Sequence, residues 1–341
     1  MNSPNKILII RFSAIGDIVL TTVVIRLLKK RYPKASIHYL TKKNMCELLQ
    51  FNPHIDKVIG YDANSTSLIE LVKEVRNEKY DWIVDVHKNI RSRVIRFFGG
   101  ASTKVTYSKR YFERFLYLKF KKGIKNPIHT IDKYLSYLHK KGIVNDNLGT
   151  AVFYNSDTMK KSVSSYFIKD TSKTLISICP GASYRTKQWS EEHFFSLIKE
   201  LSKQNFQVVL IGGKQDEKLC ERIKVNNKVI NLAGKLSLLQ SAYVLKESVL
   251  AITNDSGMMH LAESQQTPVI AVFGSTTPAL GFYPILPNSI VVENNEINCR
   301  PCHSKGKTVC PYEHFNCMKK ISSKMVMNKI NEYITSFDYA P

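Results

Sequence analysis

The sequence of 341 residues has no apolar run of the length that crosses a membrane. The apolar stretch at residues 18–28 is broken by Arg26, whereas a membrane-spanning helix needs about 20 predominantly apolar residues. The first strand-like segment begins by Lys6, which leaves no room for a signal peptide ahead of it. We therefore expect a protein of the cytoplasm that does not span the membrane.

The sequence also lacks a regular cysteine framework. It holds seven cysteines, an odd number, and Cys46, Cys179 and Cys220 each stand alone in the sequence. Structural disulfides are typical of oxidising compartments, where cysteines come in pairs at regular spacings. The cysteine usage of this chain therefore agrees with a reducing cytoplasm.

Acidic residues are scarce, and most of the imbalance lies in the first half of the chain. The formal net charge is +22: residues 1–150 hold 28 Lys and Arg against 12 Asp and Glu, a net +16, and residues 151–341 hold 22 against 16, a net +6. From Lys88 to Lys125, twelve cations accompany one acid, Glu113, with aromatic residues interleaved. A solvated surface is one explanation; anionic lipid, phosphorylated glycolipid and nucleic acid are the candidate partners.

Two nucleotide-related signatures are missing. The first strand-to-helix turn has no G-x-G-x-x-G, and Asp17 occupies the place where the pyrophosphate of a dinucleotide would lie. No RNA-binding signature accompanies the basic run. A dinucleotide-dependent oxidoreductase is therefore disfavoured, and a basic nucleic-acid-binding protein with a degenerate Rossmann fold is kept as an alternative of a different class.

Strand-like and helix-like segments alternate along the chain, which predicts an α/β protein with parallel sheets. With 43% apolar residues, the chain can bury two cores of ordinary domain size. A polar stretch at residues 145–149 separates two such series, so we predict domains at 1–150 and 151–325 and a closing helix with tail at 326–341. The predicted strands are residues 6–11, 37–40, 57–61, 82–86, 104–106, 174–179, 207–211, 228–232, 249–253, 269–273 and 290–293, and the predicted helices are residues 17–31, 67–77, 91–98, 129–141, 191–203, 238–246, 258–264 and 322–337.

A short turn, Ser13-Ala14-Ile15-Gly16-Asp17, follows the first predicted strand. In open α/β sheets, ligands bind where the carboxyl ends of parallel strands meet helix N-termini. Asp17 is accordingly a candidate general base, because a carboxylate at a helix N-terminus is stabilised in its charged form. A plain N-cap is the alternative role, and the two roles can coexist.

The second half of the chain carries comparable turns after its own strands. Pro180-Gly181-Ala182-Ser183 is followed by Lys187, Gln188 and Trp189; its small residues would let a ligand approach the backbone, and the lysine could neutralise a phosphate. The turn Asn254-Asp255-Ser256-Gly257 leads to His260, one helical turn later. Free amides there could hold a pyrophosphate while the Asp255 carboxylate accepts hydrogen bonds from sugar hydroxyls.

A third junction, Phe273-Gly274-Ser275-Thr276-Thr277-Pro278, lies in the same half and supplies hydroxyl groups. Together with residues 9–17, 180–189 and 254–260, it makes the chain resemble glycosyltransferase family 9, the ADP-heptose:lipopolysaccharide heptosyltransferases, and in particular resemble heptosyltransferase II-like members. The order and distances of these motifs fit that family over nearly the whole chain.

The resemblance implies a GT-B fold, in which two Rossmann-like, doubly wound domains face a cleft. It implies an acceptor-binding N-terminal domain and a nucleotide-sugar-binding C-terminal domain. It further implies inversion at the anomeric carbon without a metal, with Asp17 as the catalytic base and Lys187 stabilising the departing diphosphate. The donor-binding candidates are Ser183, Lys187, Asp255, Ser256, Gly257, Met258, His260, Thr276 and Thr277, and the acceptor-binding candidates are Ser13, Gly16, Lys88, Arg91, Arg93 and Arg96.

The function that the resemblance implies is transfer of heptose from ADP-heptose to a phosphorylated lipopolysaccharide inner-core acceptor. The expected partners are the nucleotide-sugar donor, an anionic glycolipid and the inner face of the cytoplasmic membrane, with peripheral association, no nucleic acid and no required cofactor. A GT-B transferase that uses another nucleotide sugar for a cell-surface glycan is the alternative within this class.

Four further cysteines stand outside this scheme. Cys299, Cys302, Cys310 and Cys317 are spaced C-x2-C-x7-C-x6-C, with His303 and His314 nearby. Four thiolates can hold a structural zinc ion, and plain reduced thiols in a loop are the simpler interpretation. We expect no metal in catalysis, and the sequence leaves the role of this cluster open.

Overall fold

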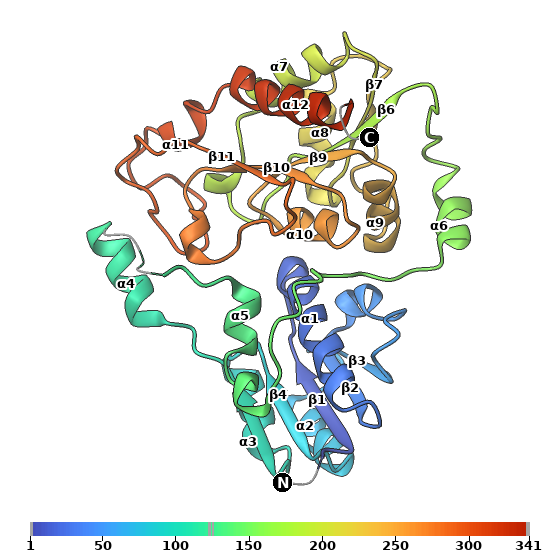
Figure 1. Cartoon of the computed structure of the whole chain (residues 1–341), viewed down its shortest axis with the longest axis vertical. Helices are drawn as coiled ribbons and strands as arrows, with labels where there is room; N and C mark the ends of the chain where they lie inside the picture. Colours follow the sequence, from blue (N-terminus) through green and yellow to red (C-terminus); the bar gives the residue numbers. More distant parts are fainter. Residues whose placement is uncertain (1–2, 122–123, 125, 339–341) are drawn as a thin grey trace. The chain divides into compact units, whose positions relative to one another are not determined.

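The computed structural model describes residues 3–121, 124 and 126–338 (Figure 1). It contains two compact units, which we call unit 1 (Met1–Lys109 with His129–Asn155) and unit 2 (Arg110–Ile128 with Ser156–Pro341). The second boundary lies close to the one predicted near residue 150. The segment 110–128 lies within the predicted first domain, but in the structure it belongs to unit 2.

Unit 1 is built on a five-stranded parallel sheet in the order β3-β2-β1-β4-β5. The order reverses between β1 and β4, which makes this the topological switch point, where ligands of open α/β sheets bind. The strands are β1 (Lys6–Ile10), β2 (Ser36–Lys42), β3 (Lys57–Tyr61), β4 (Trp82–Asp85) and β5 (Thr103–Thr106), and the helices are α1 (Ile15–Arg31), η1 (Lys43–Leu48), α2 (Leu68–Asn77), α3 (Ile90–Phe98), α5 (Thr130–Leu135) and η2 (Leu138–Lys141).

The centre of unit 1 is the pair formed by β1 and α1. Four of the five β1 residues are fully buried, as expected for a central strand covered on both faces. Helix α1 is apolar around most of its circumference and packs against α5. The turn between β1 and α1 is therefore fixed at both ends by buried structure.

Unit 2 is built on a six-stranded sheet in the order β11-β10-β9-β6-β7-β8, again with parallel pairing throughout. Its switch point lies between β6 and β9. The strands are β6 (Thr174–Cys179), β7 (Phe206–Leu210), β8 (Ile230–Asn231), β9 (Leu250–Asn254), β10 (Val269–Phe273) and β11 (Ile290–Glu293), and the helices are α4 (Tyr111–Phe120), α6 (Ser156–Val163), η3 (Arg185–Lys187), α7 (Glu191–Leu201), η4 (Lys214–Asp216), α8 (Glu217–Ile223), α9 (Leu238–Lys246), α10 (Gly257–Glu263), η5 (Pro278–Leu280), α11 (Asn316–Lys319) and α12 (Ser323–Asp338).

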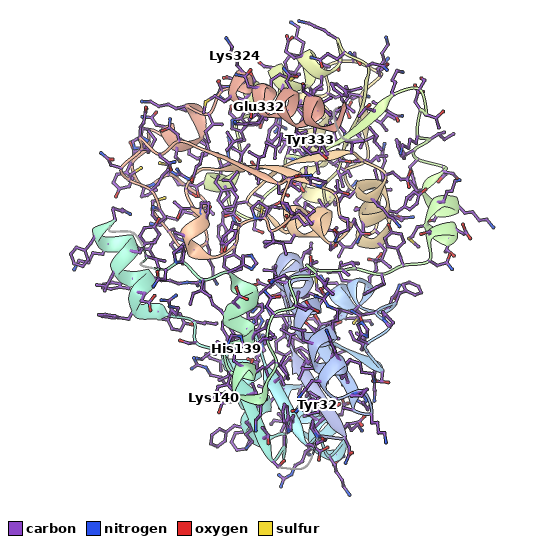
Figure 2. All side chains as sticks on the ribbon, viewed as in Figure 1. Tyr32, His139, Lys140, Lys324, Glu332 and Tyr333 are labelled. Carbon is purple, nitrogen blue, oxygen red and sulfur yellow. The ribbon has the colours of Figure 1, made fainter. Side chains whose placement is uncertain are left out.

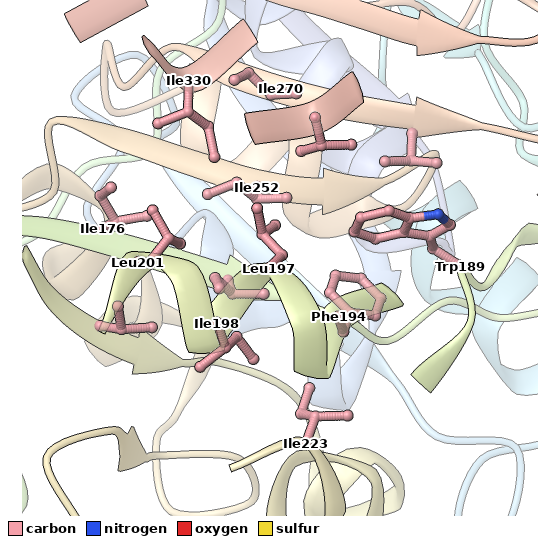
Figure 3. Close-up of a cluster of buried hydrophobic side chains, with 14 of the residues drawn as sticks. Ile176, Trp189, Phe194, Leu197, Ile198, Leu201, Ile223, Ile252, Ile270 and Ile330 are labelled. Atoms are coloured by element: carbon pink, nitrogen blue, oxygen red, sulfur yellow. The ribbon is translucent and has the colours of Figure 1, made fainter. Parts of the chain in front are cut away.

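The core of unit 2 lies between its sheet and helices α7, α8 and α12, as Figure 3 shows. Trp189 and Phe194 form an aromatic pair with ring centroids 4.9 Å apart, and both are buried. Tyr333 on α12 donates a hydrogen bond to the Val249 carbonyl at 3.2 Å, while Lys324 and Glu332 of the same helix are exposed (Figure 2). The predicted helix at the end of the chain therefore closes the second sheet.

The helices of the structure differ from the predicted ones in two respects. The helix predicted at residues 129–141 is divided into α5 and η2. The α-helices α4, α6, α8 and α11 were not predicted. Among the described residues, no helix is both long and apolar enough to cross a membrane.

Candidate functional site

The candidate base Asp17 lies at the carboxyl end of β1, in the first turn of α1. The N-cap of α1 is Ala14, so the structure does not give Asp17 the alternative role of N-cap; its Oδ2 instead accepts from the Ala14 backbone amide at 3.4 Å. Gly16 is buried in the same turn, and Ser13 is partly exposed. The Asp17 side chain retains 19% of its exposure, so solvent or a ligand can reach the carboxylate.

Asp17 is held by two side chains of unit 1. Its Oδ2 forms an ion pair with Arg11 Nη2 at 2.5 Å, and its Oδ1 accepts a hydrogen bond from the Tyr134 hydroxyl at 2.8 Å. Tyr134 comes from α5, 117 residues along the chain. Both carboxylate oxygens therefore have a fixed direction.

The ionisation of Asp17 follows from these contacts. Burial alone would raise the pKa of its carboxyl group, but the Arg11 guanidinium, with hydrogen bonds from Tyr134 and the Ala14 amide, outweighs burial and holds the pKa below its usual value. The same burial raises the pKa of the Tyr134 phenol well above its usual value. Asp17 is thus a carboxylate at neutral pH, while Tyr134 remains a neutral hydrogen-bond donor.

Arg11 is committed to the protein as well as to Asp17. Its Nη1 donates to the Val86 carbonyl at 2.6 Å and its Nε donates to the Ser13 carbonyl at 2.7 Å. The guanidinium also lies 5.7 Å from the Tyr134 ring centroid. Arg11 therefore ties the turn after β1 to the end of β4, across the switch point.

The four basic acceptor candidates after β4 have different surroundings. Lys88 Nζ donates to the Tyr107 carbonyl at 2.8 Å, and Arg96 Nε lies 3.8 Å from Oδ2 of the buried Asp85. Arg93 is exposed to solvent. Arg91 lines a pocket of about 440 Å³, which the ends of β2 and β3 complete. The remaining lining residues of that pocket are Lys42, Lys43, Asn44, Tyr61, Asp62, Ala63 and Asn64.

In unit 2, the donor candidates meet at the carboxyl ends of β6, β9 and β10. Asp255 Oδ2 forms an ion pair with Lys187 Nζ at 2.8 Å and accepts a hydrogen bond from the Thr276 hydroxyl at 2.6 Å. The two charged side chains retain 15% and 8% of their exposure, for Lys187 and Asp255 respectively. Three separate sequence motifs are thus joined at one carboxylate.

Asn254, at the end of β9, is hydrogen-bonded to the loop that follows β6. Its side-chain oxygen accepts from the Trp189 amide at 3.0 Å, and its side-chain nitrogen donates to the Pro180 carbonyl at 2.7 Å. The Trp189 indole donates to the Ile321 carbonyl at 2.7 Å, which anchors the loop in the core. Gly181 serves packing rather than ligand access, because a Cβ there would collide with the Asp216 carboxylate.

The remaining donor candidates lie around this cluster in different environments. Gly257 opens α10 with Met258 beside it, both partly exposed, and His260 is buried in the same helix. Within the described residues, the Ser256 hydroxyl oxygen is buried without a hydrogen-bond partner. Ser183 is exposed, whereas Thr277 pairs with the Tyr117 hydroxyl of α4 at 2.9 Å.

The cysteine-containing segment after β11, residues 299–317, contacts the turns that carry the donor-binding candidates. Arg300, which is buried, donates to the carbonyls of Phe273 at 3.1 Å and Thr276 at 2.9 Å, and it pairs with Glu293 at 2.7 Å. Gly306 has φ +91° and lies against Lys187, where a Cβ would come within 2.9 Å of the lysine Cγ. The segment therefore restricts the loop that carries the lysine.

The four clustered cysteines are free thiols. Cys299 Sγ lies 3.8 Å from His314 Nε2, and Cys302 Sγ lies 3.9 Å from the Ser275 carbonyl oxygen. Burial raises the pKa of the Cys317 thiol to about 12. In the part of the chain that the structure describes, no three His, Cys, Asp or Glu side chains are grouped to hold a metal ion, so the zinc alternative has no preformed set of ligands.

Comparison with known proteins assigns a family to this arrangement. The model of glycosyltransferase family 9 (heptosyltransferase) matches residues 68–313, well over half of the chain. The protein belongs to glycosyltransferase family 9. This family 9 enzyme is 26% identical to lipopolysaccharide heptosyltransferase 2 of Escherichia coli (strain K12) over 302 residues, which cover 80% of this chain and 84% of the relative.

Two solved structures share the fold of this family 9 glycosyltransferase. The E. coli ADP-heptose LPS heptosyltransferase II has a TM-score of 0.77 at 21% identity, covering 98% of this chain and 99% of the other. The E. coli heptosyltransferase WaaC with ADP has a TM-score of 0.70 at 18% identity, covering 96% and 99%. The predicted α/β class with two doubly wound sheets of the GT-B kind is thereby confirmed.

Three contacts of the candidate site in this family 9 enzyme were not predicted from the sequence. Arg11 was placed at the end of a strand without a role, although its position just before the Asp17 turn was a usable signal. Tyr134 is too distant in the sequence for any local signal. Arg300 stands between two cysteines, and no local pattern in the sequence indicates that its side chain reaches the turn after β10.

Proposed function

We propose that this protein is an inverting, metal-independent transferase that moves heptose from ADP-heptose to a phosphorylated lipopolysaccharide inner-core acceptor. The observation that carries the proposal is the Asp17 carboxylate, which is ionised, oriented and accessible at the switch point of unit 1. Inverting glycosyl transfer needs one such base, because the acceptor hydroxyl must lose its proton as it attacks.

In the proposed reaction, Asp17 Oδ takes the proton of the acceptor hydroxyl. The acceptor oxygen then forms a bond to the anomeric carbon on the face opposite the diphosphate, and the bond from that carbon to the diphosphate oxygen breaks. ADP leaves with the electron pair. Lys187 stabilises the charge that develops on the departing diphosphate, which is the electrostatic contribution expected where no divalent cation takes part.

We assign the binding of the nucleotide-sugar donor to unit 2. The Lys187–Asp255 pair and the Thr276 hydroxyl converge at the carboxyl ends of three strands, where phosphates and sugars bind in doubly wound sheets. Two solved relatives, the E. coli ADP-heptose LPS heptosyltransferase II and the E. coli heptosyltransferase WaaC with ADP, favour an adenine nucleotide. Asp255 would accept from sugar hydroxyls, and the lysine would move from Asp255 toward phosphate.

The acceptor assignment rests on unit 1. Lys42, Lys43 and Arg91 surround the pocket at the ends of β2 and β3, and Asp62 is the single acid that lines it. Such a pocket suits a phosphorylated sugar, because clustered cations bind phosphate by charge-assisted hydrogen bonds. The acceptor is a glycolipid in this proposal, which puts the enzyme at the inner face of the cytoplasmic membrane as a peripheral protein.

Calorimetric titration with ADP, UDP and GDP at moderate salt, without added metal, tests the proposal. Selective binding of ADP is the expected result. A preference for UDP or GDP would keep the transferase but replace the heptose donor with another nucleotide sugar. Binding of a polyanion such as heparin in place of all three nucleotides would overturn the enzymatic function and favour the nucleic-acid alternative.

A further inference from the structure

Helix α4 carries its apolar side chains on the outside. At about 100° per residue, Phe112, Phe115 and Phe120 fall on one side of the helix, and they are 73%, 56% and 54% exposed. The opposite side carries Arg114 and Tyr117, and Tyr117 is the one residue of α4 that is buried. This arrangement is the reverse of an ordinary surface helix, whose apolar side faces the core.

The inner side of α4 is attached to unit 2 by polar contacts. Tyr117 pairs with the Thr277 hydroxyl at 2.9 Å, and Arg114 Nη2 donates to the Leu280 carbonyl at 3.1 Å. The Arg114 guanidinium also lies 6.0 Å from the Phe282 ring centroid. These contacts fix the orientation of the helix, so its phenylalanines are held outward.

Core packing does not account for α4. Helix α3 also exposes Phe97 and Phe98, but α3 covers β4 and packs beside α2, as a layer helix of the sheet does. In the described ranges, no sheet or helix packs broadly on α4. A helix of ten residues is marginal in water when it buries so little, and outward phenylalanines add an unfavourable exposed apolar surface. The outer side of α4 therefore lacks the partner that would stabilise it.

The charges around α4 indicate what kind of partner would cover its outer side. The sequence has six Lys and Arg between residues 109 and 122, and the single acid, Glu113, pairs with Arg110 at 2.5 Å. Lys119 lies among the phenylalanines, 5.9 Å from the Phe115 ring centroid and 5.4 Å from that of Phe120. A helix with aromatic residues on one side and a surplus of cations is typical of the surface of an anionic bilayer.

We infer that α4 is the element that binds this enzyme to an anionic membrane surface, with Phe112, Phe115 and Phe120 inserted at the level of the headgroups. The inference rests on the proposed function, in which the acceptor is a membrane glycolipid. Lys119 interacts with anionic headgroups beside the inserted rings. Because Tyr117 and Arg114 hold the turn at η5, the membrane-bound helix is also attached to the donor side of the enzyme.

Co-sedimentation of the full chain with vesicles tests this inference. The vesicles contain phosphatidylcholine and phosphatidylglycerol in equal parts, with pure phosphatidylcholine for comparison. The variant Phe112→Ser with Phe115→Ser should bind the anionic vesicles about a hundredfold more weakly, since each fully inserted phenylalanine contributes about a factor of ten. Lys119→Ala should weaken binding about fivefold, and wild type should bind pure phosphatidylcholine less tightly.

Two matched variants control for the loss of any exposed apolar side chain. Phe97→Ser with Phe98→Ser removes the exposed rings of α3, and Ile168→Ser removes a side chain that is 76% exposed elsewhere in unit 2. Both should bind the anionic vesicles as wild type does. Circular dichroism and the ADP titration confirm that each variant is folded, because neither measurement depends on the outer side of α4.

The outcomes separate this inference from the proposed function. Unchanged vesicle binding by the α4 variant, or a loss confined to the α3 variant, would overturn the assignment of α4. Wild type that binds ADP but no vesicles would also overturn it and leave the transferase intact. Vesicle binding that depends on α4 without any nucleotide binding would support α4 and refute the transferase. Tight binding of single-stranded DNA through the same phenylalanines, without vesicle binding, would assign the surface to nucleic acid instead.

Discussion

The switch points of the two units hold similar clusters that differ in how the cation is bound. In unit 1, Asp17 pairs with Arg11 and accepts from the Tyr134 hydroxyl. In unit 2, Asp255 pairs with Lys187 and accepts from the Thr276 hydroxyl. Each cluster thus contains one carboxylate, one cation and one hydroxyl donor at the end of a central strand.

The difference between the clusters lies in what else the cation contacts. Arg11 also donates to two backbone carbonyls, and its planar group fits all three acceptors at once. Lys187 is a point charge on a flexible stem, on a loop that belongs to a different strand from its carboxylate partner. The arginine is therefore a fixed counter-ion that orients Asp17, the base in our proposal. The lysine, in the same proposal, can leave Asp255 for an incoming phosphate.

Asp17→Asn should have the largest effect, because it removes the base and keeps the shape of the turn. We expect the rate of transfer to fall about a thousandfold or more, with ADP affinity unchanged, since ADP binds in the other unit in our proposal. Initial rates and calorimetric titration measure the two quantities. Turnover close to that of wild type would remove Asp17 as the base.

Lys187→Met tests the cation of the second cluster and should slow transfer about a hundredfold. ADP affinity should fall as well, in contrast to the Asp17 variant, because the lysine binds the diphosphate before and during reaction. Lys214→Met is the matched control, since this lysine is 80% exposed and forms a surface ion pair with Glu217. An equal loss in both lysine variants would mean that general positive charge, rather than the position of Lys187, is what matters.

Arg11→Met should change the pH dependence of the reaction. Without the guanidinium, burial dominates and the pKa of Asp17 rises, so the acid limb of the kcat/KM profile should move to higher pH. In wild type, the lowered pKa makes the carboxylate stabilising above the pKa of an unfolded Asp, about 3.9, and this contribution is lost as the pH falls below it. The variant should accordingly lose stability at neutral pH and differ less from wild type in acid.

Arg26→Met is the control for that experiment, because Arg26 pairs with Asp146 at 2.7 Å elsewhere in unit 1. It should reduce stability without moving the acid limb. If both arginine variants gave the same pH profile, Arg11 would have no special influence on the ionisation of Asp17.

Tyr134→Phe should have the smallest effect of the series. It removes one hydrogen bond to Asp17 Oδ1, a contribution of about 1 kcal/mol, and leaves the ion pair in place. We expect the acid limb to shift in the same direction as in Arg11→Met but less far, and the rate to fall several-fold. A pH profile identical to that of wild type would show that the phenol does not influence the ionisation of Asp17.

Periodicity predicted most of the fold because short apolar runs bounded by polar residues specify parallel strands well. The strands at residues 57–61, 174–179, 269–273 and 290–293 have the bounds that the sequence indicated. Helix α4 was missed for a physical reason, since its apolar residues do not face a core and its inner side is polar. A helical pattern shows which residues share a side, but it does not show whether that side points inward.

Only the parts of the candidate site that lie within one short stretch of sequence could be predicted. Asp17, Lys187 and Asp255 each follow a strand, and the strand-to-helix turn is visible in the residues themselves. The pairing of Lys187 with Asp255 depends on the order of strands in the second sheet, and the contact of Tyr134 with Asp17 depends on how α5 packs on α1. Those contacts belong to the tertiary structure, so propensity and spacing do not reveal them.

The path of the chain between the units has a consequence for dissecting the protein. The chain passes from unit 1 to unit 2 after Lys109, returns after Ile128, and passes to unit 2 again after Asn155. A fragment ending at Asn155 would carry α4 without Thr277 and Leu280, its hydrogen-bond partners, while a fragment starting at Ser156 would leave that docking surface bare. A cut after Asn155 would leave the segment 110–128 of unit 2 covalently attached to unit 1. Complete separation of the two units therefore requires that this segment be transferred to the second fragment by grafting.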